Sequence, residues 1–374
     1  MLLVALVAGG VYFGFGHSGG GAVGSQSAEA SPSGGAASAA SVAAGRWGAS
    51  HGPYGGPAYV VAAAPSISDI VYVGTARGVF ASRNGGRSWD SAGLAVPQGS
   101  LQVVGPRITS LAVDPRAPAT VYAARSMSVD GGVTSRQGLF KSTNGGQSWR
   151  ALGMAAGQVA VSPADPARLY AITEEAVWTK PNRLFRSTNG GRQWQPADRH
   201  LASTRFWALA FDPTRAATVY AATARGVLKS TDGGHSWQRG TGALSRQEVS
   251  AVAVDPRDPQ TVYAGTDGGV IKSRDGGRTW RIVNTVMGSH GRDRAIGQVS
   301  SLVVDPLDSQ TVYATARFAG IFKSSDGGRR WNSANTDDLS RCSDASLALA
   351  AGAPQTIYGV CAWRGVFKLS LIHI

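Results

Sequence analysis

Short apolar runs recur along the chain at a regular spacing, and each ends at glycine, proline, asparagine or aspartate. One pair of runs flanks an Asp-Pro turn and ends in Thr-Val-Tyr-Ala; it appears at Leu111–Ala123, Leu209–Ala221, Val252–Ala264 and Leu302–Ala314. A third run, Gly-Val-Phe-Lys-Ser or a close variant, follows each pair. Because these runs are short, β-branched and aromatic, they predict β-strands.

An eight-residue motif, Ser-x-(Asn/Asp)-Gly-Gly-x-x-Trp, occurs six times, at Ser82–Trp89, Ser142–Trp149, Ser187–Trp194, Ser230–Trp237, Ser273–Trp280 and Ser324–Trp331. Asn-Gly-Gly or Asp-Gly-Gly between two strands predicts a hairpin, because glycine adopts positive φ without a steric clash. We expect the Asn or Asp side chain to bond backbone N–H groups of its own turn, helped by the serine. The tryptophan is expected to pack across the base of the hairpin. This reading makes the motif structural.

The tyrosines of the second run number seven: Tyr72, Tyr122, Tyr170, Tyr220, Tyr263, Tyr313 and Tyr358. Each marks a unit with strands A, B and C, the motif turn, and a strand D that begins near the tryptophan. Four antiparallel strands in such a period are typical of a propeller blade. The sequence therefore predicts an all-β fold, a single β-propeller of seven four-stranded blades. The seventh unit lacks a motif, and we expect a strand beginning at Trp47 to complete it and close the ring.

These repeats resemble the Asp-box (BNR) repeats of sialidases, sortilin-type receptors, xyloglucan hydrolases and photosystem II assembly-factor propellers. The resemblance covers residues from about 46 to 368. It implies that the motif turns lie at the blade periphery, away from the face that carries function.

The ends of the chain differ in composition from the repeats. Met1–Phe15 is an uncharged apolar run, expected to be a signal or membrane-anchor segment, and residues 16–45 form a Gly/Ser/Ala-rich linker. The propeller is expected over residues 46–368, outside the cytoplasm, and Leu369–Ile374 is expected to be a non-native tail. Cys342 and Cys361 both lie in the last unit, and whether they pair depends on how the loop after Cys342 curls.

The net charge of +13 favours anionic partners, although the charge is spread along the whole chain. On the face opposite the motif turns, arginines recur in the short B–C connections, at Arg77, Arg225, Arg317 and Arg364. We expect these four to be ligand-binding residues that form a positive collar suited to carboxylate, sulfate or phosphate. The alternative, that they are ordinary solvated loop residues, stays open.

An enzymatic function is not favoured. The Phe/Tyr-Arg-Ile-Pro motif expected from the sialidase resemblance is absent, and no metal, cofactor or nucleophile motif occurs. The acids outside the predicted turns are scattered among different units: Asp130, Glu174, Glu175, Asp198, Glu248, Asp267, Asp293, Asp337, Asp338 and Asp344. We therefore expect no catalytic residues, no cofactor and no metal. Asp267, in Tyr-Ala-Gly-Thr-Asp-Gly-Gly, matches both a plain glycine turn and a stretch of xyloglucan hydrolases.

The sequence thus predicts a non-catalytic binding or assembly scaffold outside the cytoplasm, for a protein partner or an acidic glycan or polymer. Nucleic acid is disfavoured as a partner, and the membrane is one only if Met1–Phe15 is retained. Two alternatives stay open: a glycoside hydrolase of sialidase or xyloglucanase type, and a receptor-like sensor domain.

Overall fold

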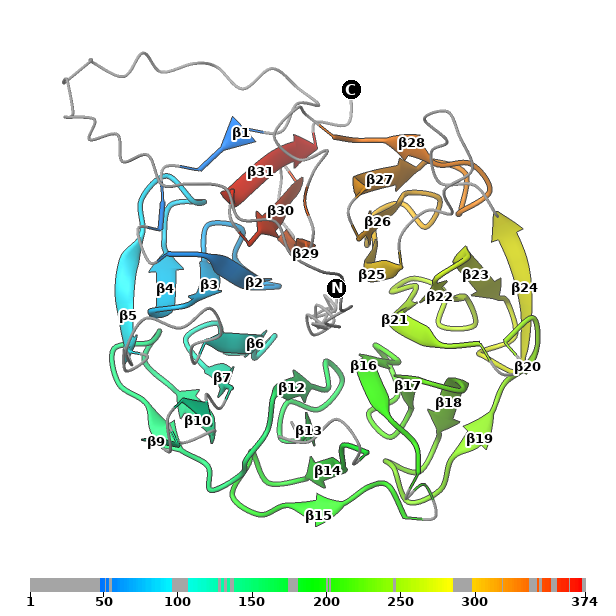
Figure 1. Cartoon of the computed structure of the whole chain (residues 1–374), viewed down its shortest axis with the longest axis horizontal. Helices are drawn as coiled ribbons and strands as arrows, with labels where there is room; N and C mark the ends of the chain where they lie inside the picture. Colours follow the sequence, from blue (N-terminus) through cyan, green and yellow to red (C-terminus); the bar gives the residue numbers. More distant parts are fainter. Residues whose placement is uncertain are drawn as a thin grey trace, which may run out of the picture.

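The computed structural model describes residues 48–50, 52–53, 56–95, 107–126, 129–130, 133–134, 138–173, 181–199, 201, 203–244, 247–284, 298–317, 319–335, 342, 345–350, 355–362 and 364–371. These residues form a closed ring of seven four-stranded blades around a central axis, with one further strand added at the rim of blade 5 (Figure 1). No helix occurs among them. The predicted all-β, seven-bladed propeller is confirmed.

Each blade runs outward from strand A at the axis to strand D at the rim, with strands A to D antiparallel; β20 pairs in parallel with β24. The first three blades are β2 (Ala58–Ala63), β3 (Val71–Thr75), β4 (Gly78–Ser82) and β5 (Asp90–Ala95); β6 (Ile108–Val113), β7 (Val121–Arg125), β10 (Gly138–Ser142) and β11 (Arg150–Ala151); and β12 (Gln158–Val161), β13 (Leu169–Ile172), β14 (Leu184–Ser187) and β15 (Gln195–Pro196). The next three are β16 (Phe206–Phe211), β17 (Val219–Thr223), β18 (Gly226–Ser230) and β19 (Gln238–Arg239); β21 (Val249–Val254), β22 (Val262–Thr266), β23 (Gly269–Ser273) and β24 (Thr279–Asn284); and β25 (Val299–Val304), β26 (Val312–Ala316), β27 (Gly320–Ser324) and β28 (Asn332–Ser333). Blade 7 has β29 (Ala345–Ala350), β30 (Gln355–Cys361), β31 (Gly365–Leu371) and β1 (Gly48–Ala49), while β20 (Thr241–Gly242) adds to the rim of blade 5 and β8 (Val129–Asp130) pairs with β9 (Val133–Thr134).

The core lies between the blades. Strand B is buried along its whole length, as in β3 and β22, because a neighbouring blade covers each of its faces. Valine and alanine fill these narrow interfaces, and all seven strand-B tyrosines are 2% exposed or less. This burial on both faces explains why the runs show no polar alternation.

Closure comes from both ends of the chain. In β1, Gly48 lies opposite Lys368 and Ala49 opposite Phe367 of β31, and the Ser50 N–H donates to the Val366 carbonyl at 2.8 Å. The predicted closing strand is therefore present, whereas Trp47 itself lies outside the described residues. β31 also includes Leu369–Leu371, the first half of the expected tail, and Leu369 is buried.

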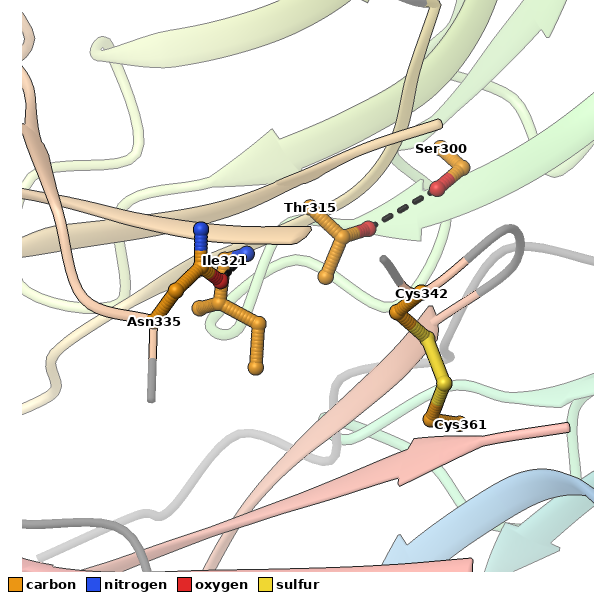
Figure 2. Close-up of a disulfide and its surroundings, with 6 residues drawn as sticks. All are labelled: Ser300, Thr315, Ile321, Asn335, Cys342 and Cys361. Carbon is orange, nitrogen blue, oxygen red and sulfur yellow. Dashed lines mark hydrogen bonds between the residues drawn. A yellow bond between two sulfur atoms is a disulfide. The ribbon is translucent and has the colours of Figure 1, made fainter. Parts of the chain in front are cut away.

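Cys342 and Cys361 form a disulfide with a Cα–Cα distance of 5.7 Å, which resolves the question left open by the sequence. Cys361 lies opposite Ala345 in the β29–β30 pair. Both cysteines belong to an apolar cluster with Ile321 of blade 6, so the bond lies at the interface of blades 6 and 7 (Figure 2). In the same view, Ser300 and Thr315 of blade 6 share a hydrogen bond of 2.8 Å.

The motif turns are held by the predicted side-chain bonds. Asp275 Oδ1 accepts from the Ser273 hydroxyl at 2.7 Å and from the N–H groups of Arg278 and Thr279 at 3.0 and 2.9 Å. The Thr279 hydroxyl donates to Asp275 Oδ2 at 2.6 Å, and the Gly277 N–H donates to Ser273 Oγ at 2.8 Å. Within the turn, therefore, most polar groups are paired.

Each motif turn also joins its blade to the preceding one. In five of the six motifs the carbonyl of the first motif glycine accepts from a strand-C cation of that blade, as when Lys229 Nζ donates to Gly276 at 2.8 Å, and Tyr220 Oη donates to the same oxygen at 3.1 Å. At Gly145 the donor is Arg83 of the preceding motif turn, at 3.3 Å. The tryptophan bonds inward and outward: Trp149 Nε1 reaches the Gly146 carbonyl at 3.0 Å and the Ala92 carbonyl of blade 1 at 2.5 Å. Trp237 and Trp89 likewise reach the Ala197 carbonyl and Ser50 Oγ of the preceding blade, so three of the motif tryptophans connect two blades by hydrogen bonds, which the expectation of a contact within one hairpin did not include.

We expect Asp275→Ala to lower the free energy of unfolding by about 1–2 kcal/mol, because the turn loses the acceptor of four hydrogen bonds. Chemical denaturation at neutral pH measures the effect. Asp275→Asn is the matched control, since asparagine stands at this position in three of the other motifs (Asn84, Asn144 and Asn189), and it should cost much less. Equal losses for both variants would contradict this role of the side chain.

The same turn predicts a dependence on acid. Burial of Asp275 opposes its charge, but hydrogen bonds from Thr279, Ser273 and Arg278 outweigh this and lower its pKa to about 2. In the unfolded chain the pKa is about 3.9, so the stabilisation is complete above that pH and is lost as pH falls toward about 2. Between about pH 5 and 2, denaturation curves should therefore show wild type losing more stability than Asp275→Asn. A difference in unfolding free energy between wild type and Asp275→Asn that stays constant with pH would contradict this role of the Asp275 charge.

Candidate functional site

The antiparallel order of each blade divides the ring into two faces. The B–C face carries the B–C turns and the starts of strands A, and the motif face carries the motif turns and the Asp-Pro turns. Because the motif turns are occupied by bonds between blades, the B–C face has more freedom to vary its side chains.

Arg77 and Arg225 are exposed at the centre of two-residue B–C turns with the same construction. Thr75 Oγ1 accepts the Arg77 N–H at 3.0 Å and donates to the Gly78 carbonyl at 3.0 Å. Thr223 does the same for Arg225, with distances of 3.2 Å and, to the Gly226 carbonyl, 2.7 Å. The backbone below each guanidinium is therefore fixed by a buried threonine.

Arg317 and Arg364 are held differently. Arg317 is half-buried, and its N–H donates to the Gln298 carbonyl at 3.0 Å. Arg364 is exposed, and its N–H donates at 3.0 Å to the carbonyl of Cys361, the disulfide residue. Three of the four predicted arginines lie in the consecutive blades 6, 7 and 1. The fourth, Arg225, lies in blade 4, and blade 5 separates it from the others. Together they form an uneven arc on one face.

Five of the innermost strands carry a register irregularity at the end next to the B–C turns. It falls on the second strand residue, which is half-buried in every case: Tyr59, Thr109, Trp207, Ser250 and Ser300. Such bulges change the direction of a side chain, often beside a binding site. Thr109 and Ser250 donate to backbone carbonyls of the next blade, Gly157 at 2.7 Å and Val299 at 2.6 Å.

The two aromatic members of this set pair with arginine. The Arg107 guanidinium lies 5.2 Å from the centre of the Tyr59 ring, and Arg205 lies 5.6 Å from that of Trp207. Tyr59 lies in blade 1 and Trp207 in blade 4, so the two aromatic residues are well separated around the ring. These two pairs were not expected from the sequence, although tyrosine and tryptophan replace serine or threonine at one position of strand A.

The acids of the B–C face fall into two groups. Asp198 is 3% exposed and accepts from Arg183 Nη2 at 2.9 Å and from the Leu184 N–H at 3.3 Å, so it anchors strand C of blade 3. Glu248 and Asp267, in contrast, lie close enough to interact. Burial raises the pKa of Glu248, the charge of Asp267 raises it further, and Gln298 and Arg205 oppose the shift.

This interaction corrects the expectation that the acids are scattered. Glu248 precedes strand A and Asp267 follows strand B of one blade, and the antiparallel pairing brings those two ends together. Glu174, Glu175, Asp293, Asp337, Asp338 and Asp344 lie outside the described residues, as does the side chain of Asp130. Among the described residues, no group of three histidine, cysteine or acidic side chains gathers as a metal site would require.

No helix that could span a membrane is found within the described part of the chain, and Met1–Phe15 lies outside it.

Comparison with solved structures finds many proteins of this fold. An ancestral GH74 enzyme superposes with a TM-score of 0.62 at 21% identity over 87% of this chain, which spans 46% of that enzyme. YCF48 bound to D1 peptide gives 0.57 at 14% identity, over 87% of this chain and 97% of YCF48. The extracellular domain of a putative one-component system from B. thetaiotaomicron gives 0.56 at 12% identity, over 83% of this chain and 38% of that one.

No family model matches the chain, and no curated protein matches it by sequence. At these identities the structural likeness shows the seven-bladed propeller fold, which enzymes and binding proteins share.

Proposed function

We propose that this chain is a non-catalytic binding or assembly scaffold that holds an anionic ligand or a protein partner on its B–C face. The observation that carries the proposal is the presentation of Arg77 and Arg225 on turns fixed by buried threonines. Among the described residues, no carboxylate forms an ion pair with either arginine. A guanidinium held in this way recognises carboxylate, sulfate or phosphate with two parallel hydrogen bonds.

The aromatic–arginine pairs Tyr59–Arg107 and Trp207–Arg205 add surface suited to a partner that is partly apolar. Aromatic and arginine side chains are the residues most often found at the centre of protein interfaces. The overlap of this fold with YCF48, a propeller solved with D1 peptide bound, covers 87% of this chain and 97% of YCF48 and supports a protein partner. We also interpret the six motif repeats as Asp-box repeats.

We place this function outside the cytoplasm. The Cys342–Cys361 disulfide favours an oxidising compartment, because thiols are kept reduced in the cytosol. The apolar run at Met1–Phe15 agrees with export or with anchoring to a membrane.

Binding to an acidic polymer such as heparin should weaken steeply as salt rises, because salt screens exposed charges. We expect Arg225→Gln combined with Arg317→Gln to reduce that salt dependence, measured by titration at several ionic strengths. The matched control is Arg87→Gln with Arg278→Gln, two exposed arginines of the motif turns. Equal effects from the two pairs would mean diffuse attraction without a site on the B–C face.

A glycoside hydrolase is the second candidate, and the coupling of Glu248 to Asp267 is the observation that favours it. Such enzymes need one carboxyl kept protonated near neutral pH and a second kept ionised. Glu248, with its raised pKa, would be the acid. Arg205 acts against this role, since its positive charge lowers the pKa of Glu248.

We expect no hydrolysis of sialosides, xyloglucan or uronate polymers above background, because a neighbouring cation and a half-exposed position make Glu248 a poor general acid. A screen for released reducing sugar tests this with the whole chain. Turnover that disappears in Glu248→Gln or Asp267→Asn, and persists in the Asp198→Asn control, would make the hydrolase the leading function.

A further inference from the structure

A cavity of about 350 Å³ opens on the motif face between blades 2 and 3. Blade 2 supplies Lys141, Trp149 and Arg150 to its lining, and the next motif turn supplies Arg192. The hydroxyl residues Thr143 and Ser148 complete the polar part of the wall. This site lies on the opposite face from the B–C turns and does not depend on the proposed function.

The strand register places two cations of this cavity face to face. Lys141 of β10 lies directly opposite Arg150 of β11. Like charges in directly opposite positions destabilise an antiparallel pair. In blades 3, 4 and 6 the strand-C cation instead faces a neutral amide side chain, in the pairs Arg186–Gln195, Lys229–Gln238 and Lys323–Asn332.

Within the part of the chain that the structure describes, no carboxylate lines the cavity to balance this charge. Burial lowers the pKa of Lys141, and the neighbouring charges of Arg150 and Arg192 lower it further, against an opposing effect of Asp114. Asp114 is occupied in its own turn, where Oδ1 accepts the N–H groups of Arg116 and Ala117 at 2.8 and 3.1 Å. An anion among the three cations would relieve their mutual repulsion.

We propose that this cavity binds a small sugar that carries a phosphate or sulfate ester. A tetrahedral oxyanion with several oxygens can accept from two guanidinium groups and an ammonium at once. Ser148 Oγ accepts from Asn144 Nδ2 at 2.8 Å, which orients the serine hydroxyl to donate elsewhere. The Thr143 hydroxyl adds a further donor.

The size of the cavity indicates more than a bare ion. About 350 Å³ is roughly ten times the volume of one water molecule in the liquid. The ring of Trp149 lines this space, and a sugar ring offers C–H groups that pack on an aromatic surface. The anionic group and the ring therefore each have a counterpart in the wall.

The interface of blades 5 and 6 provides a matched comparison. Lys272 also lies opposite an arginine there, Arg281, and Arg329 corresponds to Arg192. However, Lys272 is only 7% exposed and donates to Tyr263 Oη at 2.8 Å and to the Gly327 carbonyl at 3.2 Å, whereas Lys141 is half-buried and contacts the corresponding Gly190 carbonyl at 3.5 Å. The Lys272 ammonium is thus directed into the blade interface, and we expect no sugar ester to bind there.

Calorimetric titration of the full chain with glucose 6-phosphate and glucose 6-sulfate tests the proposal. We expect saturable binding of at least one ester, weakened about tenfold or more by Arg150→Gln combined with Arg192→Gln. The control Arg281→Gln with Arg329→Gln should bind as wild type. Both pairs of side chains are exposed, so thermal denaturation should show that the variants remain folded.

Glucose alone should not bind, and inorganic phosphate should bind more weakly than glucose 6-phosphate. Absence of saturable binding of both esters would overturn the proposal, as would equal losses in the two double variants. Equal affinity for inorganic phosphate and glucose 6-phosphate would overturn the sugar part, since the wall around Trp149 would then contribute nothing.

Discussion

The ring depends on the carbonyl of the first motif glycine, which points into the interface between two blades. A buried carbonyl must be paired, and here a lysine or arginine of the preceding blade donates to it. The contact recurs in Lys141–Gly190, Arg186–Gly233, Lys229–Gly276 and Lys272–Gly327. Lys368 makes the same contact with Gly85 across 283 residues of sequence, so the bond that joins neighbours also closes the ring.

This use of the motif explains how the two faces divide their tasks. The side chains of the motif turns are committed to their own backbone and to the adjacent blade, so most changes there cost stability. In the B–C turns the threonine fixes the backbone, as in Thr75–Gly78 and Thr223–Gly226. Two residues lie between the threonine and the glycine, and the second carries an exposed side chain that is arginine in both turns.

The sequence predicted what repeats: the strands, the blade count and the turn bonds. It could not predict what depends on one blade alone. The disulfide required the course of the chain after Cys342. The interaction of Glu248 with Asp267 could be predicted only from the pairing that brings their two strand ends together. The exposure of Trp207 follows from a bulge at a position where the residue type differs between blades. The repeated residues therefore predict the fold, whereas the candidate site residues are those that differ from one blade to the next.

The Lys141–Arg150 pair shows why a structural repeat is not excluded from function. The motif around it keeps its serine, asparagine, glycines and tryptophan, so the turn folds as its relatives do. Only the partner of the strand-C cation has changed from an amide to an arginine, and Arg192 of the next blade brings a third charge. Blade 5 has a similar set of charges but directs its lysine to a tyrosine hydroxyl. In the interface of blades 5 and 6 the lysine is therefore paired within the protein. In the interface of blades 2 and 3 the three cations can bind an anionic ligand.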